Sequence, residues 1–138
     1  MPRRALLLLT AALCCALTAC GGEDYANKPR PASPINITAA ISTKKISVSP
    51  KTFGAGPIVI IISNQTSQTQ TLTIQTQELA GKQPGLKQSS KPIDPNDTGN
   101  LKLDVRKGTY SVSAKGVAPV TLEVGPPRKS AQGQLLEP

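Results

Sequence analysis

Hydrophobic and polar residues alternate along most of the chain after residue 34, and this alternation predicts short β-strands. Ile35, Ile37, Ala39 and Ile41 take every second position, as in a strand with one buried face. The same period recurs at 46–48, 72–74, 101–105, 110–114 and 120–124. Residues 57–63 form a continuous β-branched run instead, which predicts a central strand covered on both faces.

The segments between these strands are rich in glycine, proline, asparagine and serine, which predicts turns. Gly54-Ala55-Gly56-Pro57 is interpreted as a turn before the apolar strand, because no helix and no Lys-Ser/Thr pair follow to make a phosphate loop. Residues 94–100 place oxygen ligands at alternating positions, yet Val105 stands where a calcium loop needs glutamate, so a solvated turn is predicted. About seven short strands predict an all-β fold, an antiparallel Greek-key β-sandwich.

The first residues have the layout of an export signal. Arg3 and Arg4 precede an apolar run from Ala5 to Leu17 that is 13 residues long, whereas a membrane span needs about 20. The run ends in Leu17-Thr18-Ala19-Cys20, which resembles the lipobox of bacterial lipoproteins. The resemblance implies cleavage before Cys20 and lipid attachment to its thiol. The competing interpretations are an ordinary cleaved signal with an incidental cysteine, and twin-arginine export through Arg3-Arg4.

Composition divides the rest of the chain. We expect a lipoprotein signal peptide at 1–19, a flexible tether at 20–34, a β-sandwich domain at 35–125 and a disordered tail at 126–138, since both flanking segments are polar and rich in glycine and proline. Removal of the signal leaves 119 residues and a single cysteine, Cys20, so no internal disulfide is expected.

The predicted mature chain carries 14 basic and 8 acidic residues, without a long basic block. Pairs such as Arg106-Lys107 and Arg128-Lys129 are interpreted as solvated turns or strand ends. Three aromatic residues, Tyr25, Phe53 and Tyr110, are too few for the stacking platforms of a nucleic-acid surface. We therefore expect no nucleic-acid partner, and a diffuse positive charge that suits anionic lipid headgroups or cell-wall polymers.

The order of motifs resembles the cupredoxin-like sandwich, the fold of small blue copper proteins, over most of residues 36–125. The motifs are the apolar strand 58–62 with an asparagine turn from Asn64, and the sequence Gly108-Thr109-Tyr110 with a closing strand at 120–124. Immunoglobulin-like domains share much of this pattern. In the cupredoxin family a histidine and a cysteine would stand where this chain has Gln70 and Ala114.

The chain has no histidine, and its one methionine is Met1, so it lacks the ligand set of a blue copper centre. The sequence predicts no metal site and no cofactor. Histidine-dependent catalysis is excluded, and Ser42 with Lys45 has the Ser-x-x-Lys spacing without a helix to hold it. No catalytic residue is predicted.

These features predict a lipid-anchored, non-catalytic β-sandwich on the extracytoplasmic side of the cell membrane, with cell-wall polymer or an envelope protein as its partner. The alternative is a ligand-binding or metal-handling accessory that uses amides and carboxylates such as Gln70, Asp94 and Asp97. The Gln/Thr-rich segment 63–77 is either a sugar-binding surface or a polar strand with one wet face.

Overall fold

The computed structural model describes residues 31–79 and 85–130, and within these ranges the chain has eight strands and no helix. The predicted all-β fold class is therefore confirmed. The strands are β1 Ile35–Ile41, β2 Ile46–Ser49, β3 Thr52–Asn64, β4 Thr73–Leu79, β5 Lys87–Ser89, β6 Thr98–Val105, β7 Gly108–Ala114 and β8 Val117–Pro127. Cys20 and the lipobox residues Leu17, Thr18 and Ala19 lie outside the described residues. In the described part, no helix is long and apolar enough to cross a membrane.

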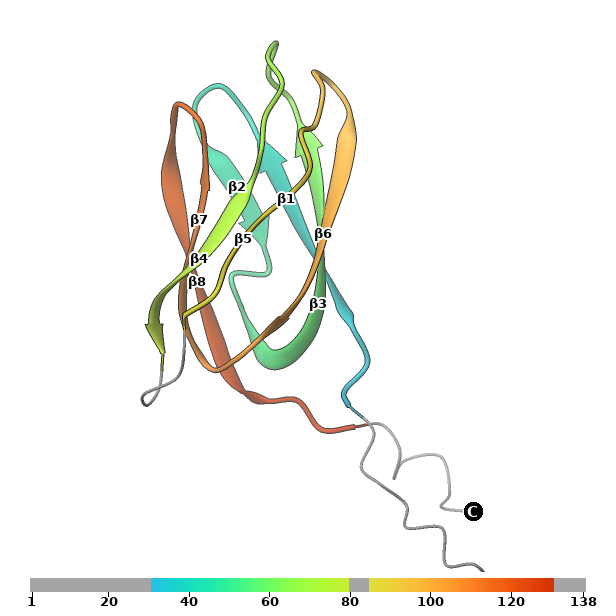
Figure 1. Ribbon diagram of the computed structural model, residues 1–138, viewed down its shortest axis with the longest axis vertical. Coiled ribbons are helices and arrows are strands. Elements are labelled where there is room, and N and C mark those ends of the chain that lie inside the picture. The colour runs from blue at the N-terminus through green and yellow to red at the C-terminus, as the bar shows by residue number, and fades with distance from the viewer. Residues whose placement is uncertain (1–30, 80–84, 131–138) are drawn as a thin grey trace, which may run out of the picture.

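The strands form two sheets that share β3 (Figure 1). In the first sheet β1 lies between β2 and β3, and β6 pairs with the other side of β3. The second sheet runs from the first residues of β3 through β8, β7 and β4 to β5. The pairs β1–β3 and β3–β8 are parallel, so the sheet is mixed where an antiparallel one was predicted. The reason is that β2 carries the chain back before β3 begins, and β3 then runs in the direction of β1.

Strand β3 bends from one sheet into the other. Its residues Thr52–Ala55 pair with β8 and its residues Gly56–Ser63 pair with β6, with a register shift after Gly54. Gly56 has a φ of 128°, which residues with a side chain rarely adopt. The turn predicted at Gly54–Pro57 is therefore wrong, because these residues form a corner inside one 13-residue strand.

The core lies between the two sheets and follows the two-residue period. In β3, Ile58, Ile60 and Ile62 are buried, while Val59 is half-buried and Ile61 is 38% exposed. The prediction that this strand is covered on both faces is therefore wrong for the described residues. Its β-branched side chains fit either face of a pleated strand. The buried apolar residues are Ile37, Ala39, Ile41, Ile46, Val48, Ala55, Ile58, Ile60, Ile62, Leu72, Ile74, Ile93, Leu103, Val105, Tyr110, Val112, Leu122 and Val124.

One strand, β5, lies in a segment that the sequence predicted to be a connection between strands. Its three residues, Lys87–Ser89, are all exposed and pair with Thr73–Gln75 at the edge of the second sheet. These residues, Lys-Gln-Ser, include no apolar side chain, so no hydrophobic period marks the strand.

The end of β8 extends beyond the domain boundary predicted at residue 125. The strand continues to Pro127, and Arg128 donates hydrogen bonds to the carbonyls of Ser33, Gly54, Ala55 and Pro57. The prediction that the disordered tail begins at residue 126 is therefore wrong for 126–128, and residues 131–138 lie outside the described part. Arg128 binds the last strand both to the corner of β3 and to the segment that enters the domain.

Tyr110 closes the turn between β6 and β7. Its ring is buried in the core, and its hydroxyl accepts a hydrogen bond from the Arg106 N–H at 3.0 Å and donates one to the Arg106 carbonyl at 2.9 Å. This use of a tyrosine hydroxyl on backbone a few residues upstream is common in β-sandwiches. Arg106 and Lys107 therefore stand at a fixed turn at one end of the sandwich.

Candidate binding surface at the distal end

The strand registers bring four connections to the same end of the sandwich. Asn64 at the end of β3 pairs with Ile41 at the end of β1, and Ser63 pairs with Thr98 at the start of β6. Thr73 at the start of β4 pairs with Ser89 and with Ser113. We call this end, with the connections 42–45, 65–72, 90–97 and 115–116, the distal end. It is the upper end in Figure 1, far from Pro31, where the described chain begins.

Buried polar side chains gather at this end. In the described ranges, the polar residues that are buried are Asn64, Thr66, Gln70 and Ser90. All four stand in or next to the distal connections. Because a buried polar group must find a partner, such groups fix the loops that carry them.

Asn64 is the centre of this network. Its side chain is fully buried, and its amide nitrogen donates to the carbonyls of Gln68, Ile93 and Asp94 at 2.7, 2.9 and 3.1 Å. Its amide oxygen accepts from the N–H of Thr66 at 3.0 Å and lies 2.8 Å from the Thr66 hydroxyl. One side chain thus joins the connection between β3 and β4 to the connection between β5 and β6.

Residues 94–97 form a hydrogen-bonded turn, as predicted, but the prediction is wrong for residues 98–100, which are the first residues of β6. Asp97 donates its N–H to the Asp94 carbonyl at 3.1 Å, and Asn96 takes a positive φ of 61°. The two carboxylates are exposed, and each accepts one hydrogen bond: Asp94 from the Thr69 hydroxyl of the neighbouring connection, and Asp97 from the adjacent Thr98 N–H. Both acidic groups therefore stabilise the loops in which they stand.

A hollow of about 330 Å³ lies beside this turn. Its lining includes the polar side chains of Lys91, Asp97 and Asn100. Gly99, which also lines it, packs closely on Ile93, because a Cβ at position 99 would come within 2.7 Å of the Ile93 side chain. Residues with an ammonium, a carboxylate and an amide group therefore surround the hollow.

Gln70 lies at the position where the family resemblance implies a histidine. Its backbone N–H and carbonyl both bond to Ile93, at 2.9 and 2.8 Å, which fixes it below the distal surface. Its side chain is 7% exposed, and the amide oxygen Oε1 is buried without a hydrogen-bond partner. Among the buried side chains of the described residues, Gln70 therefore carries the oxygen that has no hydrogen-bond partner.

The residues here do not fit a blue copper centre. Gln70 offers an amide in place of an imidazole, and Ala114, which packs against the core, offers no thiolate. Among the described residues, no group of three or more His, Cys, Asp or Glu side chains could hold a metal ion. Gln70, Asp94 and Asp97 come from neighbouring connections without forming such a group.

The Gln/Thr-rich segment 63–77 combines a loop with a strand that has one wet face. Leu72 and Ile74 are buried, while Gln75 and Gln77 are exposed. Its threonines serve the fold: the Thr73 hydroxyl lies 2.8 Å from that of Ser89, and the Thr76 hydroxyl accepts from the Leu86 N–H at 2.7 Å. Threonine in this segment thus bonds β4 to β5 and the residue before it.

The comparisons with known proteins bear on the fold. No protein-family model matches the chain, and no curated protein matches it. Auracyanin A, a blue copper protein of Chloroflexus aurantiacus, is similar with a TM-score of 0.50 and 14% identity over 67% of this chain and 100% of that one. Auracyanin of Roseiflexus castenholzii has a TM-score of 0.47 and 14% identity over 70% of this chain and 100% of that one. The multicopper oxidase mgLAC has a TM-score of 0.42 and 14% identity over 69% of this chain and 39% of that one. The likeness to auracyanin A shows that the fold is cupredoxin-like.

Proposed function

We propose that the protein is a lipid-anchored, non-catalytic module of the cell envelope that presents a cupredoxin-like sandwich to a partner. The observation that carries the proposal is the sequence Leu17-Thr18-Ala19-Cys20 at the end of a short apolar run. The cysteine thiolate is the nucleophile that would take up the lipid.

The fold agrees with this proposal in one respect. The described chain enters the sandwich at Pro31, at the end opposite the distal connections (Figure 1). A lipid on Cys20 would hold that end near the membrane and leave the distal hollow facing away from it. Loops held by a rigid scaffold are where binding residues commonly stand.

The anchor is tested by comparing Cys20→Ser with the matched variant Cys15→Ser, which changes a cysteine inside the apolar run. In a bacterial host fed labelled palmitate, we expect the wild type and Cys15→Ser to be labelled and to lack residues 1–19. Cys20→Ser should be unlabelled, because serine does not replace the thiolate in forming the thioether. Label that persists in Cys20→Ser, or an unlabelled wild type cut before Cys20, would contradict the anchor.

A second candidate function, ligand binding at the distal end, is favoured by the unpartnered Oε1 of Gln70. A ligand that donates a hydrogen bond, or a hard cation, would satisfy that oxygen. Copper of the blue type is not the ligand that these residues fit, since the chain has no imidazole to offer.

Gln70→Met separates the two candidates, because methionine has the same length and no amide oxygen. If Gln70 binds nothing, the free energy of unfolding of the variant should equal that of the wild type or exceed it by up to about 1 kcal/mol, since a buried unsatisfied group is removed. Thermal unfolding of both proteins, with and without chelator, measures this. If the wild type alone loses stability on chelation or dialysis, the ligand-binding candidate is correct.

A further inference from the structure

The end of the sandwich opposite the distal end, which we call the base, contains a groove where the described chain enters and leaves the sandwich. The groove has a volume of about 490 Å³, and its lining includes Pro31 where the chain enters and Arg128 where it leaves. Arg106 and Lys107, in the turn fixed by Tyr110, line it as well. Segments far apart in the sequence therefore meet at the base.

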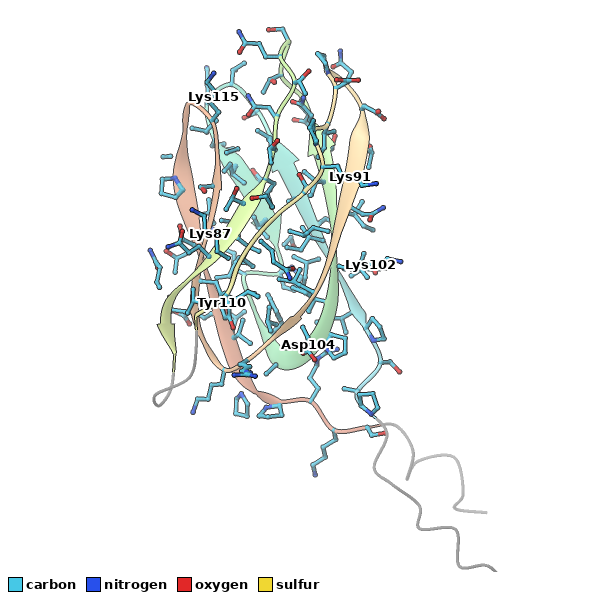
Figure 2. All side chains as sticks on the ribbon, viewed as in Figure 1. Lys87, Lys91, Lys102, Asp104, Tyr110 and Lys115 are labelled. Carbon is cyan, nitrogen blue, oxygen red and sulfur yellow. The ribbon has the colours of Figure 1, made fainter. Side chains whose placement is uncertain are left out.

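The base is positively charged. Arg106, Lys107 and Lys129 are exposed, while the Arg128 guanidinium is turned toward backbone carbonyls. Of the described residues that line the groove, Asp104 is the acidic one, and Figure 2 shows it near the lower end of β6. Cations thus outnumber carboxylates around the groove.

The distal end is less suited to an anionic surface. Its four lysines, Lys44, Lys45, Lys91 and Lys115, share that end with the two carboxylates of Asp94 and Asp97, whereas the groove at the base has one carboxylate, that of Asp104. Figure 2 shows Lys115 at the end opposite Asp104. The two ends are separated by about 23 Å, the length of the seven residues of β1. This exceeds the distance of about 8 Å over which salt screens a charge under physiological conditions.

The chain length between Cys20 and Pro31 keeps the base close to an anchored lipid. Eleven residues span at most about 40 Å when fully extended, and a flexible chain of that length has a mean end-to-end distance of about 20 Å. The base is therefore the first part of the domain to reach a membrane surface.

We propose that the base docks on anionic lipid headgroups, with Lys107 and Lys129 contacting their phosphates. The proposal rests on the anchoring proposed above, because the anchor supplies the high local concentration that makes a few surface charges sufficient. Docking fixes the orientation of the domain, so that the hollow beside Lys91 and Asp97 faces away from the lipid.

The test couples the mature chain, residues 20–138, through its single cysteine to a maleimide lipid in vesicles. This coupling makes the result independent of whether cells lipidate Cys20. The vesicles are phosphatidylcholine alone or phosphatidylcholine with about 30% phosphatidylglycerol, in the range of anionic membranes. Lysine acetylation is followed by mass spectrometry, with Lys44 and Lys45 as reporters of the distal end in the same molecule.

We expect acetylation of Lys107 and Lys129 to be about fivefold slower on the anionic vesicles, with Lys44 and Lys45 changed less than about twofold, and the difference to vanish at high salt. Lys107→Glu should release the protection of Lys129, whereas the matched variant Lys44→Glu should leave it intact. Three results would overturn the proposal: equal protection of the distal and base lysines, no protection of Lys107 and Lys129 on anionic vesicles, or the same protection of these two lysines on neutral vesicles as on anionic ones.

Discussion

Replacing Asn64 by alanine is expected to lower the free energy of unfolding by about 3–4 kcal/mol. The substitution removes one donor from each of the carbonyls of Gln68, Ile93 and Asp94, which keep one other hydrogen bond each, and it leaves the Thr66 N–H without its acceptor. Because Asn64 is fully buried, water does not replace these partners without opening the loops. In a domain of this size the loss corresponds to a melting temperature lower by about 15–20 °C.

The matched control is Gln65→Ala, which truncates the next side chain, an exposed one, and should change stability by less than about 0.5 kcal/mol. Asn64→Asp should also be strongly destabilised, since a carboxylate would turn an oxygen toward carbonyls that now accept from an amide. Thermal and denaturant unfolding of the three variants measure these effects. A melting temperature of Asn64→Ala within a few degrees of the wild type would show that the network does not hold the distal end.

Asn64 also shows how much of the candidate site the sequence could predict. An asparagine directly after an apolar strand, with Thr66 two positions later, is a recognisable Asx turn, and the turn was predicted. The burial of its side chain and its bonds to Ile93 and Asp94 were not, because they join positions about 30 residues apart. Local pattern specifies a turn, whereas its partners depend on which strands become neighbours.

The strands were predicted for the same local reason. The β-branched run at 57–63 located β3, which begins five residues earlier than predicted. Alternation marks a strand with one buried face, and it located six other strands, of which β4 ends five residues later than predicted. It did not predict the parallel pairs β1–β3 and β3–β8, since alternation carries no information on direction. It also could not tell that Val59 and Ile61 face outward, because both faces of β3 carry β-branched residues.

The corner of β3 explains why Gly54 and Gly56 were interpreted as a turn. Glycine next to proline usually ends a strand. Here a Cβ on Gly54 would lie 2.6 Å from the Arg128 side chain, and a Cβ on Gly56 would lie 3.0 Å from its guanidinium. The glycines thus make room for a residue more than 70 positions away, which a local rule does not reveal. Arg128 itself looked like a charge in a polar tail.

Replacing Arg128 by alanine is therefore expected to destabilise the domain by about 2–3 kcal/mol, although the residue lies beyond the predicted boundary. Its guanidinium donates to the carbonyls of Ser33, Gly54, Ala55 and Pro57, and it thereby joins the segment before β1 to the corner of β3. Arg128→Lys should recover only part of the loss, since an ammonium is a point donor and does not reproduce a planar fork.

Arg128→Ala should loosen the end of β8 in addition to lowering the stability of the whole domain. Loss of a surface charge alone would not loosen that end. The Arg128 N–H bonds to the Ala55 carbonyl at 3.0 Å, so its hydrogen exchange reports whether the end of β8 stays docked. In Arg128→Ala, exchange at position 128 should accelerate more than exchange at core amides of β7. The matched variant Lys129→Ala removes the neighbouring exposed charge and should leave both rates and the melting temperature unchanged. Equal effects of the two variants would mean that charge alone, and not the carbonyl cluster, holds the end of the chain.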